Sequence, residues 1–161
     1  MKSFPAAKWL WLTVLVLFSD QLTKYLASER LVLHQAVEIL PMLNFTLVHN
    51  YGAAFSFLSD SSGWQRWFLT IIALVVSVVI AVWMRRLTSG EMMTAAGLAL
   101  ILGGALGNVW DRIQLGYVVD FVDVYYQTWH WPAFNIADSA ITIGAVLLII
   151  DTFRNGRTDQ S

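Results

Sequence analysis

Long apolar stretches separated by polar segments dominate this 161-residue chain. Four of them come close to the roughly 20 mainly apolar residues that a membrane-spanning helix needs: residues 9–26, 67–84, 92–110 and 134–153. The second and third contain no charged side chain. The pattern predicts an all-α membrane protein, a bundle of four transmembrane helices in a single domain over residues 1–161.

Composition supports a membrane setting. The chain is 57% hydrophobic with a mean hydropathy of +0.59, which is too apolar for a soluble domain of this size. Several of its eight Trp and five Tyr stand at the ends of apolar stretches, as expected of side chains at headgroup depth. The absence of cysteine excludes disulfides and thiolate sites. The N-terminal apolar run resembles a signal peptide, but no cleavage motif follows, so we expect it to be retained.

Basic residues gather at one set of predicted helix ends: Lys2, Lys8, Arg85, Arg86, Arg154 and Arg157. The positive-inside rule then places both termini and the turn at 85–90 in the cytoplasm. The polar segments 27–66 and 111–133 are outer segments on this interpretation.

Two runs in the outer segments are rich in β-forming residues. Residues 43–48 follow Pro41 and precede a turn at 50–52, and residues 117–126 form the second run. We expect the two runs to pair in a small outer β-sheet that forms a cradle on the helices. In the third helix, Gly103 and Gly107 stand at the spacing that lets helix backbones approach closely in lipid.

Four aspartates, Asp20, Asp111, Asp120 and Asp138, lie where apolar stretches meet polar segments. Burying an unpaired carboxylate costs several kcal/mol or more, so a chain that keeps four of them near the bilayer is expected to use some. Asp20 and Lys24 are four residues apart and can pair on one helix face. A structural ion pair is favoured over direct catalysis, because a paired carboxylate is a poor general base.

Asn108 and Arg112 are also four residues apart and share a helix face, from which Asp111 points about 100° away. Arg112 either extends to the membrane interface or holds a phosphate, a carboxylate or a substrate carbonyl. Asn135 can be the N-cap of the fourth helix, with Asp138 in its first turn.

Asp120 is conspicuous in an apolar β-like run. It is three residues from Asp123, so a regular strand would turn one carboxylate toward the bundle and the other toward water. If Asp120 and Asp138 meet in a partly dry site, they will share a proton. One would then activate water and the other polarise an amide carbonyl, with no metal or cofactor required.

Other catalytic machinery is not indicated. His34, His49 and His130 lack metal-ligand spacing, and there is no serine-hydrolase, Walker or dinucleotide motif. Two alternatives remain open from the residues. One is a proton-coupled transporter, because intramembrane carboxylates also mark proton relays, and the other is a non-catalytic scaffold.

Five blocks in order along the chain resemble the lipoprotein signal peptidase family, also called signal peptidase II. They are Asp20-Gln21-Leu22-Thr23-Lys24, Asn50-Tyr51-Gly52-Ala53-Ala54-Phe55, residues 103–112 from Gly103 to Arg112, Val118-Val119-Asp120-Phe121, and Phe134-Asn135-Ile136-Ala137-Asp138-Ser139. The resemblance implies a multi-pass protein of the bacterial inner membrane with a periplasm-facing site. It also implies cleavage of prolipoprotein signal peptides just before a diacylglyceryl-modified cysteine.

The resemblance assigns the catalytic dyad to Asp120 and Asp138. It places substrate-binding or supporting roles on Asn50, Asn108, Arg112, Asn135, Asp20 and Lys24. The expected partners are the lipid-modified prolipoprotein and membrane lipids, without nucleic acid, and we expect a monomer.

Overall fold

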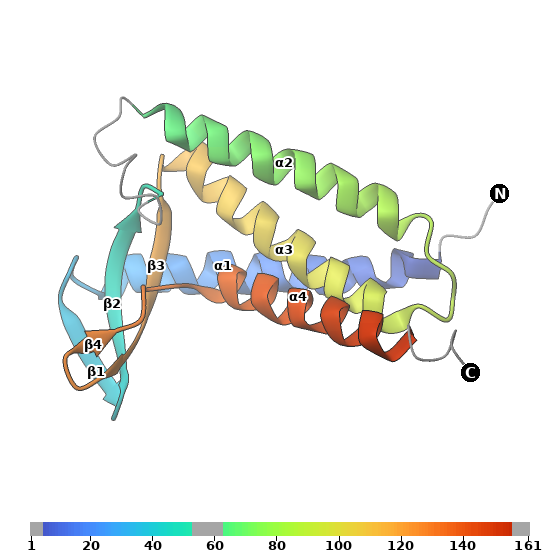
Figure 1. The fold of residues 1–161 in the computed structure, drawn as a ribbon. Helices are drawn as coiled ribbons and strands as arrows, with labels where there is room; N and C mark the ends of the chain where they lie inside the picture. Colours follow the sequence, from blue (N-terminus) through green and yellow to red (C-terminus); the bar gives the residue numbers. More distant parts are fainter. Residues whose placement is uncertain (1–4, 53–62, 156–161) are drawn as a thin grey trace.

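The computed structural model describes residues 5–52 and 63–155. Four long helices lie alongside one another, and a small sheet stands across one end of them (Figure 1). The helices are α1 (Leu10–Arg30, after a 3-10 turn at Pro5–Trp9), α2 (Trp64–Met84), α3 (Met92–Gln114) and α4 (Ile136–Asn155). The start of α1 and the end of α4 both lie at the end away from the sheet. Lys2, Arg157 and the motif residues 53–55 fall outside the described residues.

Within the described residues, three helices are long and apolar enough to cross a membrane: Trp64–Met84, Met92–Gln114 and Ile136–Arg154. Helix α1 is not among them, because its sheet-side half carries Asp20, Lys24, Glu29 and Arg30. The predicted helical character and the small antiparallel sheet are confirmed, whereas a fourth span and the position of the sheet on the outer side of the membrane stay predictions.

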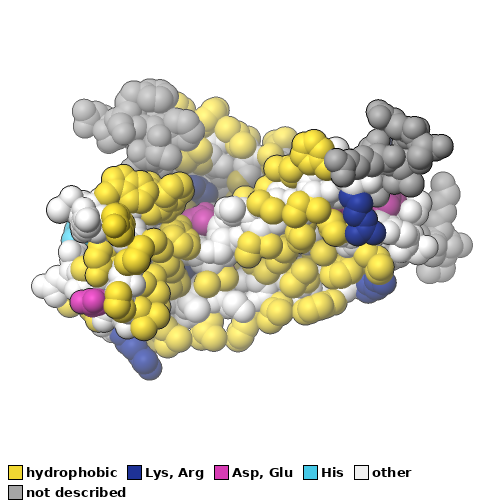
Figure 2. All heavy atoms as spheres, turned by 60° about the horizontal axis from the view of Figure 1, so that its bottom comes forward, with side chains coloured by type: hydrophobic (Ala, Val, Ile, Leu, Met, Phe, Trp, Pro, Cys, Tyr) yellow, Lys and Arg dark blue, Asp and Glu magenta, His cyan; other side chains and the backbone are white. Residues whose placement is uncertain are grey.

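Large apolar side chains cover the outside of the bundle. Figure 2 shows them over the helices and part of the sheet, with charged side chains between these regions and at the far helix end. Helix α2 is exposed along most of its length although it contains no charge after Arg66. An apolar surface this extensive is expected to face lipid rather than water.

Helix α3 is the centre of the bundle and packs against all three other long helices. A Cβ at Gly103 would lie 2.8 Å from the Thr13 carbonyl oxygen of α1, and one at Gly104 would collide with the Ala137 carbonyl of α4. The absence of side chains therefore lets two neighbouring backbones approach α3, which confirms the packing role predicted for Gly103 and extends it to Gly104.

The sheet is antiparallel with the order β1-β2-β3-β4: Ala36–Leu40, Leu43–Asn50, Val118–Tyr126 and Trp129–His130. The pairing of β2 with β3 confirms the predicted pair, with Val48 opposite Asp120 and Asn50 opposite Val118. The sequence did not predict β1 or β4.

The segment before α4 is held against β3. The backbone N–H groups of Phe121 and Val122 donate to the Phe134 carbonyl at 3.1 and 2.9 Å, and Phe134 N–H donates to the Val122 carbonyl at 3.1 Å. This arrangement brings the first turn of α4 beside Asp120.

Candidate active site

Asp120 is enclosed at the junction of the sheet and the helices, with 1% of its surface exposed. Its Oδ2 accepts a hydrogen bond from Asn50 Nδ2 at 2.9 Å, and its Oδ1 accepts one from Asn135 Nδ2 at 2.7 Å. Asp120 is thus a buried residue of β3, and its carboxyl group is held by amides from β2 and from the start of α4.

Asn135 caps α4, as predicted. Its Oδ1 accepts a hydrogen bond from the Asp138 backbone N–H at 2.9 Å, the bond expected of an N-cap side chain. Its Nδ2 lies within hydrogen-bonding distance of Asp120 Oδ1, the Val119 carbonyl at 3.2 Å and Asn108 Oδ1 at 3.4 Å. One buried side chain thus fixes both the helix start and the Asp120 carboxyl group.

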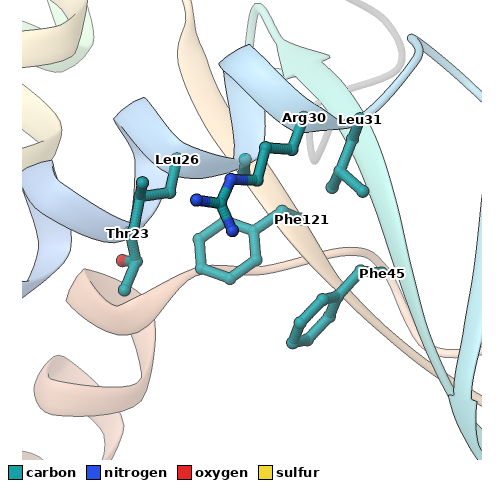
Figure 3. A pocket seen from close by; sticks show the side chains of 7 residues that line it. Thr23, Leu26, Arg30, Leu31, Phe45 and Phe121 are labelled. Carbon is teal, nitrogen blue, oxygen red and sulfur yellow. The ribbon is translucent and has the colours of Figure 1, made fainter.

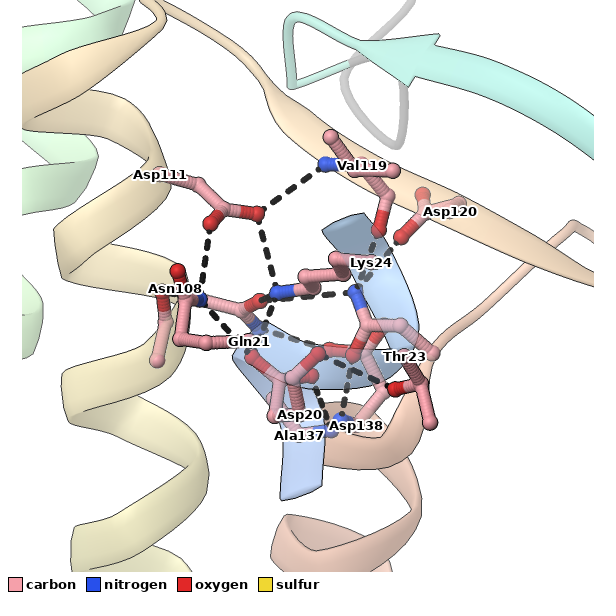
Figure 4. A network of polar contacts seen from close by, with 12 residues as sticks. Asp20, Gln21, Thr23, Lys24, Asn108, Asp111, Val119, Asp120, Ala137 and Asp138 are labelled. Atoms are coloured by element: carbon pink, nitrogen blue, oxygen red, sulfur yellow. Dashed lines mark hydrogen bonds and ion pairs between the residues drawn. The ribbon is translucent and has the colours of Figure 1, made fainter. Parts of the chain in front are cut away.

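Asp138 is partly exposed, unlike Asp120. Its Oδ1 accepts a hydrogen bond from Asn108 Nδ2 at 2.8 Å. Two amides, Asn108 and Asn135, therefore join the two carboxyl groups. Figure 4 shows Asn108, Asp120 and Asp138 within the surrounding polar network. Asp138 also lines a pocket of about 330 Å³ that is otherwise mostly apolar, with Trp131, Phe134, Ser139, Thr142 and Ile143.

A buried ion cluster supports these amides. Lys24 Nζ lies 2.8 Å from Asp20 Oδ2, 2.9 Å from Asp111 Oδ2 and 3.0 Å from Asn108 Oδ1, with only 3% of the lysine side chain exposed. The predicted Asp20–Lys24 pair is confirmed. Its partners favour the structural role, because the oxygen atoms that contact the ammonium within the described residues belong to three buried side chains.

Two further bonds of the cluster reach the backbone of other elements. Asp20 Oδ1 accepts from the Ala137 N–H of α4 at 2.9 Å, and Asp111 Oδ2 accepts from the Val119 N–H of β3 at 3.1 Å. Buried carboxylates are tolerated when hydrogen bonds complete their shells. The cluster therefore ties α1, α3, α4 and β3 together.

The roles of two members of this cluster were not predicted. Asp111 was named among the four aspartates but placed away from the helix face of Asn108 and Arg112, yet Asp111 and Asn108 both contact Lys24. The signal was their spacing of three residues, which makes side chains helical neighbours. Gln21 was quoted only as part of a motif, but its Nε2 donates to Asp111 Oδ1 at 2.9 Å and to the Gly107 carbonyl at 3.3 Å.

Gly107 has a second role beyond helix packing. A Cβ at this position would lie 2.5 Å from Asp20 Oδ2. The missing side chain provides the space in which the Asp20 carboxylate reaches Lys24.

Arg112 is half-buried beside the carboxyl pair. Its Nη1 donates to the Asn108 carbonyl at 3.3 Å, the one hydrogen bond of this guanidinium among the described residues. The charges of Asp138, Asp111 and Asp120 all attract it. The guanidinium is thus close to the dyad and has further N–H groups for a ligand.

Burial raises the pKa of Asp120 to about 6, and the nearby Asp138 carboxylate contributes in the same direction. Hydrogen bonds from Asn50 and Asn135 and the charge of Lys24 oppose this rise in pKa. Two neighbouring carboxyl groups with one proton between them form an acid and base pair.

Asp123 does not face water, so that expectation is wrong. It accepts hydrogen bonds from Asn44 and Thr46 at 3.3 and 3.2 Å and lies 2.8 Å from His130 Nδ1. Burial raises the pKa of Asp123, but hydrogen bonds from His130, Asn44 and Thr46 outweigh it and leave the pKa lowered.

Among the residues that the structure describes, no group of three His, Cys, Asp or Glu side chains could hold a metal ion.

The fold and the site define a helical membrane protein with two linked carboxyl groups beneath a small sheet, an arrangement suited to hydrolysis. Comparison with known proteins identifies the family. The sequence pattern of the family described as signal peptidase (SPase) II matches residues 12–154. This chain belongs to that family, which is a family of peptidases, and it is a multi-pass membrane protein.

Curated relatives carry the name lipoprotein signal peptidase. One from Acinetobacter baumannii is 59% identical over 90% of this chain and 82% of its own length, and one from Pseudomonas aeruginosa is 52% identical over 98% and 95%. A solved structure described as a bacterial membrane enzyme matches with a TM-score of 0.80 at 33% identity, covering 89% of this chain and 91% of its own.

Proposed function

We propose that this protein is an aspartyl endopeptidase of the bacterial inner membrane. It removes signal peptides from diacylglyceryl-modified prolipoproteins by cleaving just before the lipidated cysteine. The observation that carries this proposal is the connection of Asp120 to Asp138 through the amides of Asn135 and Asn108. Family membership and the relatives' name support the substrate class.

The different surroundings of the two carboxyl groups suggest their roles. Asp138 is partly exposed and acts as the base that takes a proton from water as the water oxygen attacks the scissile carbonyl carbon. Asp120 is buried with a raised pKa and, as the protonated member, hydrogen-bonds to the carbonyl oxygen. When the C–N bond of the tetrahedral intermediate breaks, a proton from the dyad passes to the departing amine.

The other residues position this pair. Asn50 and Asn135 orient Asp120, Asn108 orients Asp138, and the Lys24 cluster fixes Asn108. Arg112 is placed to bind a substrate carbonyl near the dyad. Preorganised groups of this kind stabilise charge that develops during the reaction without having to move.

The membrane setting suits a lipidated substrate. Each buried methylene of an acyl chain contributes about 0.8 kcal/mol to membrane attachment, so a diacylated cysteine stays at the bilayer surface. The dyad lies at the sheet-side ends of the helices, where we place the periplasm. Both termini are then cytoplasmic, and one copy of the chain supplies all the proposed residues.

The test is cleavage of a diacylated precursor peptide by purified protein, followed by mass spectrometry. Asp120→Asn and Asp138→Asn, made separately, should each reduce turnover by at least about 100-fold, the usual scale of an acid or base contribution. Asp123→Asn is the matched control on the same strand and should retain activity. Full activity in either dyad variant would falsify the assignment.

The same assay addresses the substrate. Cleavage of the lipidated precursor alone, immediately before the modified cysteine, is expected. Equal cleavage of the unlipidated form would contradict the proposed substrate class. Absence of any turnover would favour the transporter or scaffold alternative.

A further inference from the structure

A second pocket, of about 330 Å³, lies between the sheet-side end of α1 and strands β2 and β3 (Figure 3). Its walls are mainly apolar and include Leu26, Leu31, Phe45 and Phe121. The rings of Phe45 and Phe121 meet edge to face with centroids 5.8 Å apart. Phe121 directly follows Asp120, but successive strand residues point to opposite faces, so this pocket is separate from the dyad.

Among the residues that the structure describes, the lining of this pocket contains one charged side chain, Arg30. Figure 3 shows the Arg30 side chain among those that line the pocket. No hydrogen bond or ion pair joins it to any residue within 5–52 or 63–155. An uncompensated cation beside an apolar hollow is complementary to a molecule with an anionic head and an apolar body.

We propose that this pocket binds an anionic phospholipid, with part of one acyl chain against Phe45 and Phe121 and the phosphate on Arg30. A guanidinium matches phosphate oxygens through paired N–H donors. The pocket is at the end of a bundle whose flanks are apolar, which is where lipid headgroups lie. Lipid is therefore the source of anionic amphiphile that this surface meets at high concentration.

The site is independent of the proposed proteolysis, because neither Asp120 nor Asp138 lines it. Its occupant would nevertheless pack against the residue that follows Asp120 in β3. Lipid binding is therefore measured directly, so that its failure and the failure of the proposed function remain distinguishable.

The experiment is native mass spectrometry of the purified protein in detergent with equimolar phosphatidylglycerol and phosphatidylcholine of the same acyl chains. The wild-type protein should retain phosphatidylglycerol in preference, and Arg30→Gln should reduce that preference about five-fold, the effect of one basic residue near a lipid surface. Arg86→Gln is the matched control, an exposed arginine at the opposite end of the bundle, and should leave the preference unchanged.

A second variant tests the apolar part of the site. Leu26→Trp places a larger side chain at the pocket wall and should lower retention of both lipids, while its melting temperature shows that the protein is folded. Equal retention of the two lipids by the wild type, or an unchanged preference in Arg30→Gln, would overturn the proposal. So would equal competition by glycerol phosphate, since a free phosphate lacks the chain that the pocket requires.

Discussion

The side-chain nitrogen Nδ2 of Asn135 lies 2.7 Å from Asp120 Oδ1, while its side-chain oxygen Oδ1 caps the helix that carries Asp138. The position of one carboxyl group of the proposed catalytic pair is thus tied to the start of the helix that presents the other. Helix capping and site assembly share one residue, and a substitution can separate the two roles.

Asn135→Ala should therefore lose both stability and activity. Removing an N-cap costs about 1 kcal/mol, and a misplaced acid or base lowers the rate by about 100-fold. Asn135→Ser keeps a capping oxygen but lacks the amide donor, so it should recover stability without recovering activity. Melting temperatures and initial rates on a lipidated peptide provide the comparison, and recovery of activity together with stability would contradict the role of the amide.

The raised pKa of Asp120 predicts how stability depends on pH. Because the folded state binds this proton more tightly than the unfolded chain, the stabilisation is complete below about pH 4 and is lost as pH rises through about 6. Asp120→Asn removes this dependence. The stability of the wild type relative to this variant should fall between pH 4 and pH 7, by on the order of 3 kcal/mol.

Denaturant unfolding in detergent at several pH values measures this difference. A difference that stays constant with pH would show that Asp120 titrates near its ordinary pKa.

The raised pKa of Asp120 also predicts that kcat/KM declines above about pH 6, because the free enzyme then loses the proton of its proposed acid.

Lys24→Met should be strongly destabilising. It leaves Asp20 and Asp111 buried without their shared cation, and breaking a buried pair costs about 3–5 kcal/mol. Neutralising the whole cluster, with Asp20→Asn and Asp111→Asn added, should restore part of the loss in melting temperature. If the triple variant is less stable than Lys24→Met alone, charge imbalance is not the cause.

Gly107→Ala tests the space reserved for Asp20. The added Cβ would lie 2.5 Å from Asp20 Oδ2, so either the carboxylate or α3 has to move. We expect a loss of about 1–3 kcal/mol, typical of overpacking. Gly90→Ala is the matched control, because a Cβ there meets nothing within 4 Å. Equal melting temperatures for the two variants would contradict the close approach.

The sequence predicted features that are determined by residues close to one another along the chain. The Asn135 cap and the Asp20–Lys24 pair follow from short-range spacing. Strands β2 and β3 were each indicated by a β-rich run, and their predicted pairing joins segments far apart in the sequence. Helix α1 extends to Arg30, four residues beyond the predicted end, because hydropathy marks where the apolar stretch stops and not where the helix ends.

Contacts that depend on tertiary packing were harder to predict from the sequence. Asp111 meets Lys24 only because α1 packs closely against the glycines of α3. Strand β1 is short and exposed, and β4 has two residues, so neither has the alternating pattern from which a strand is predicted.

The single ammonium of Lys24 also bears on how the protein responds to its host membrane. A bilayer that is thicker or thinner than the bundle tends to tilt individual helices. Lys24 joins α1 to α3 through buried ion pairs. We therefore expect a small mismatch to tilt α2, which packs mainly against α3, and to leave the carboxyl pair in place. Activity should then stay level over a range of lipid chain lengths. It should drop sharply once the mismatch is large enough to separate α1 from α3 at Lys24.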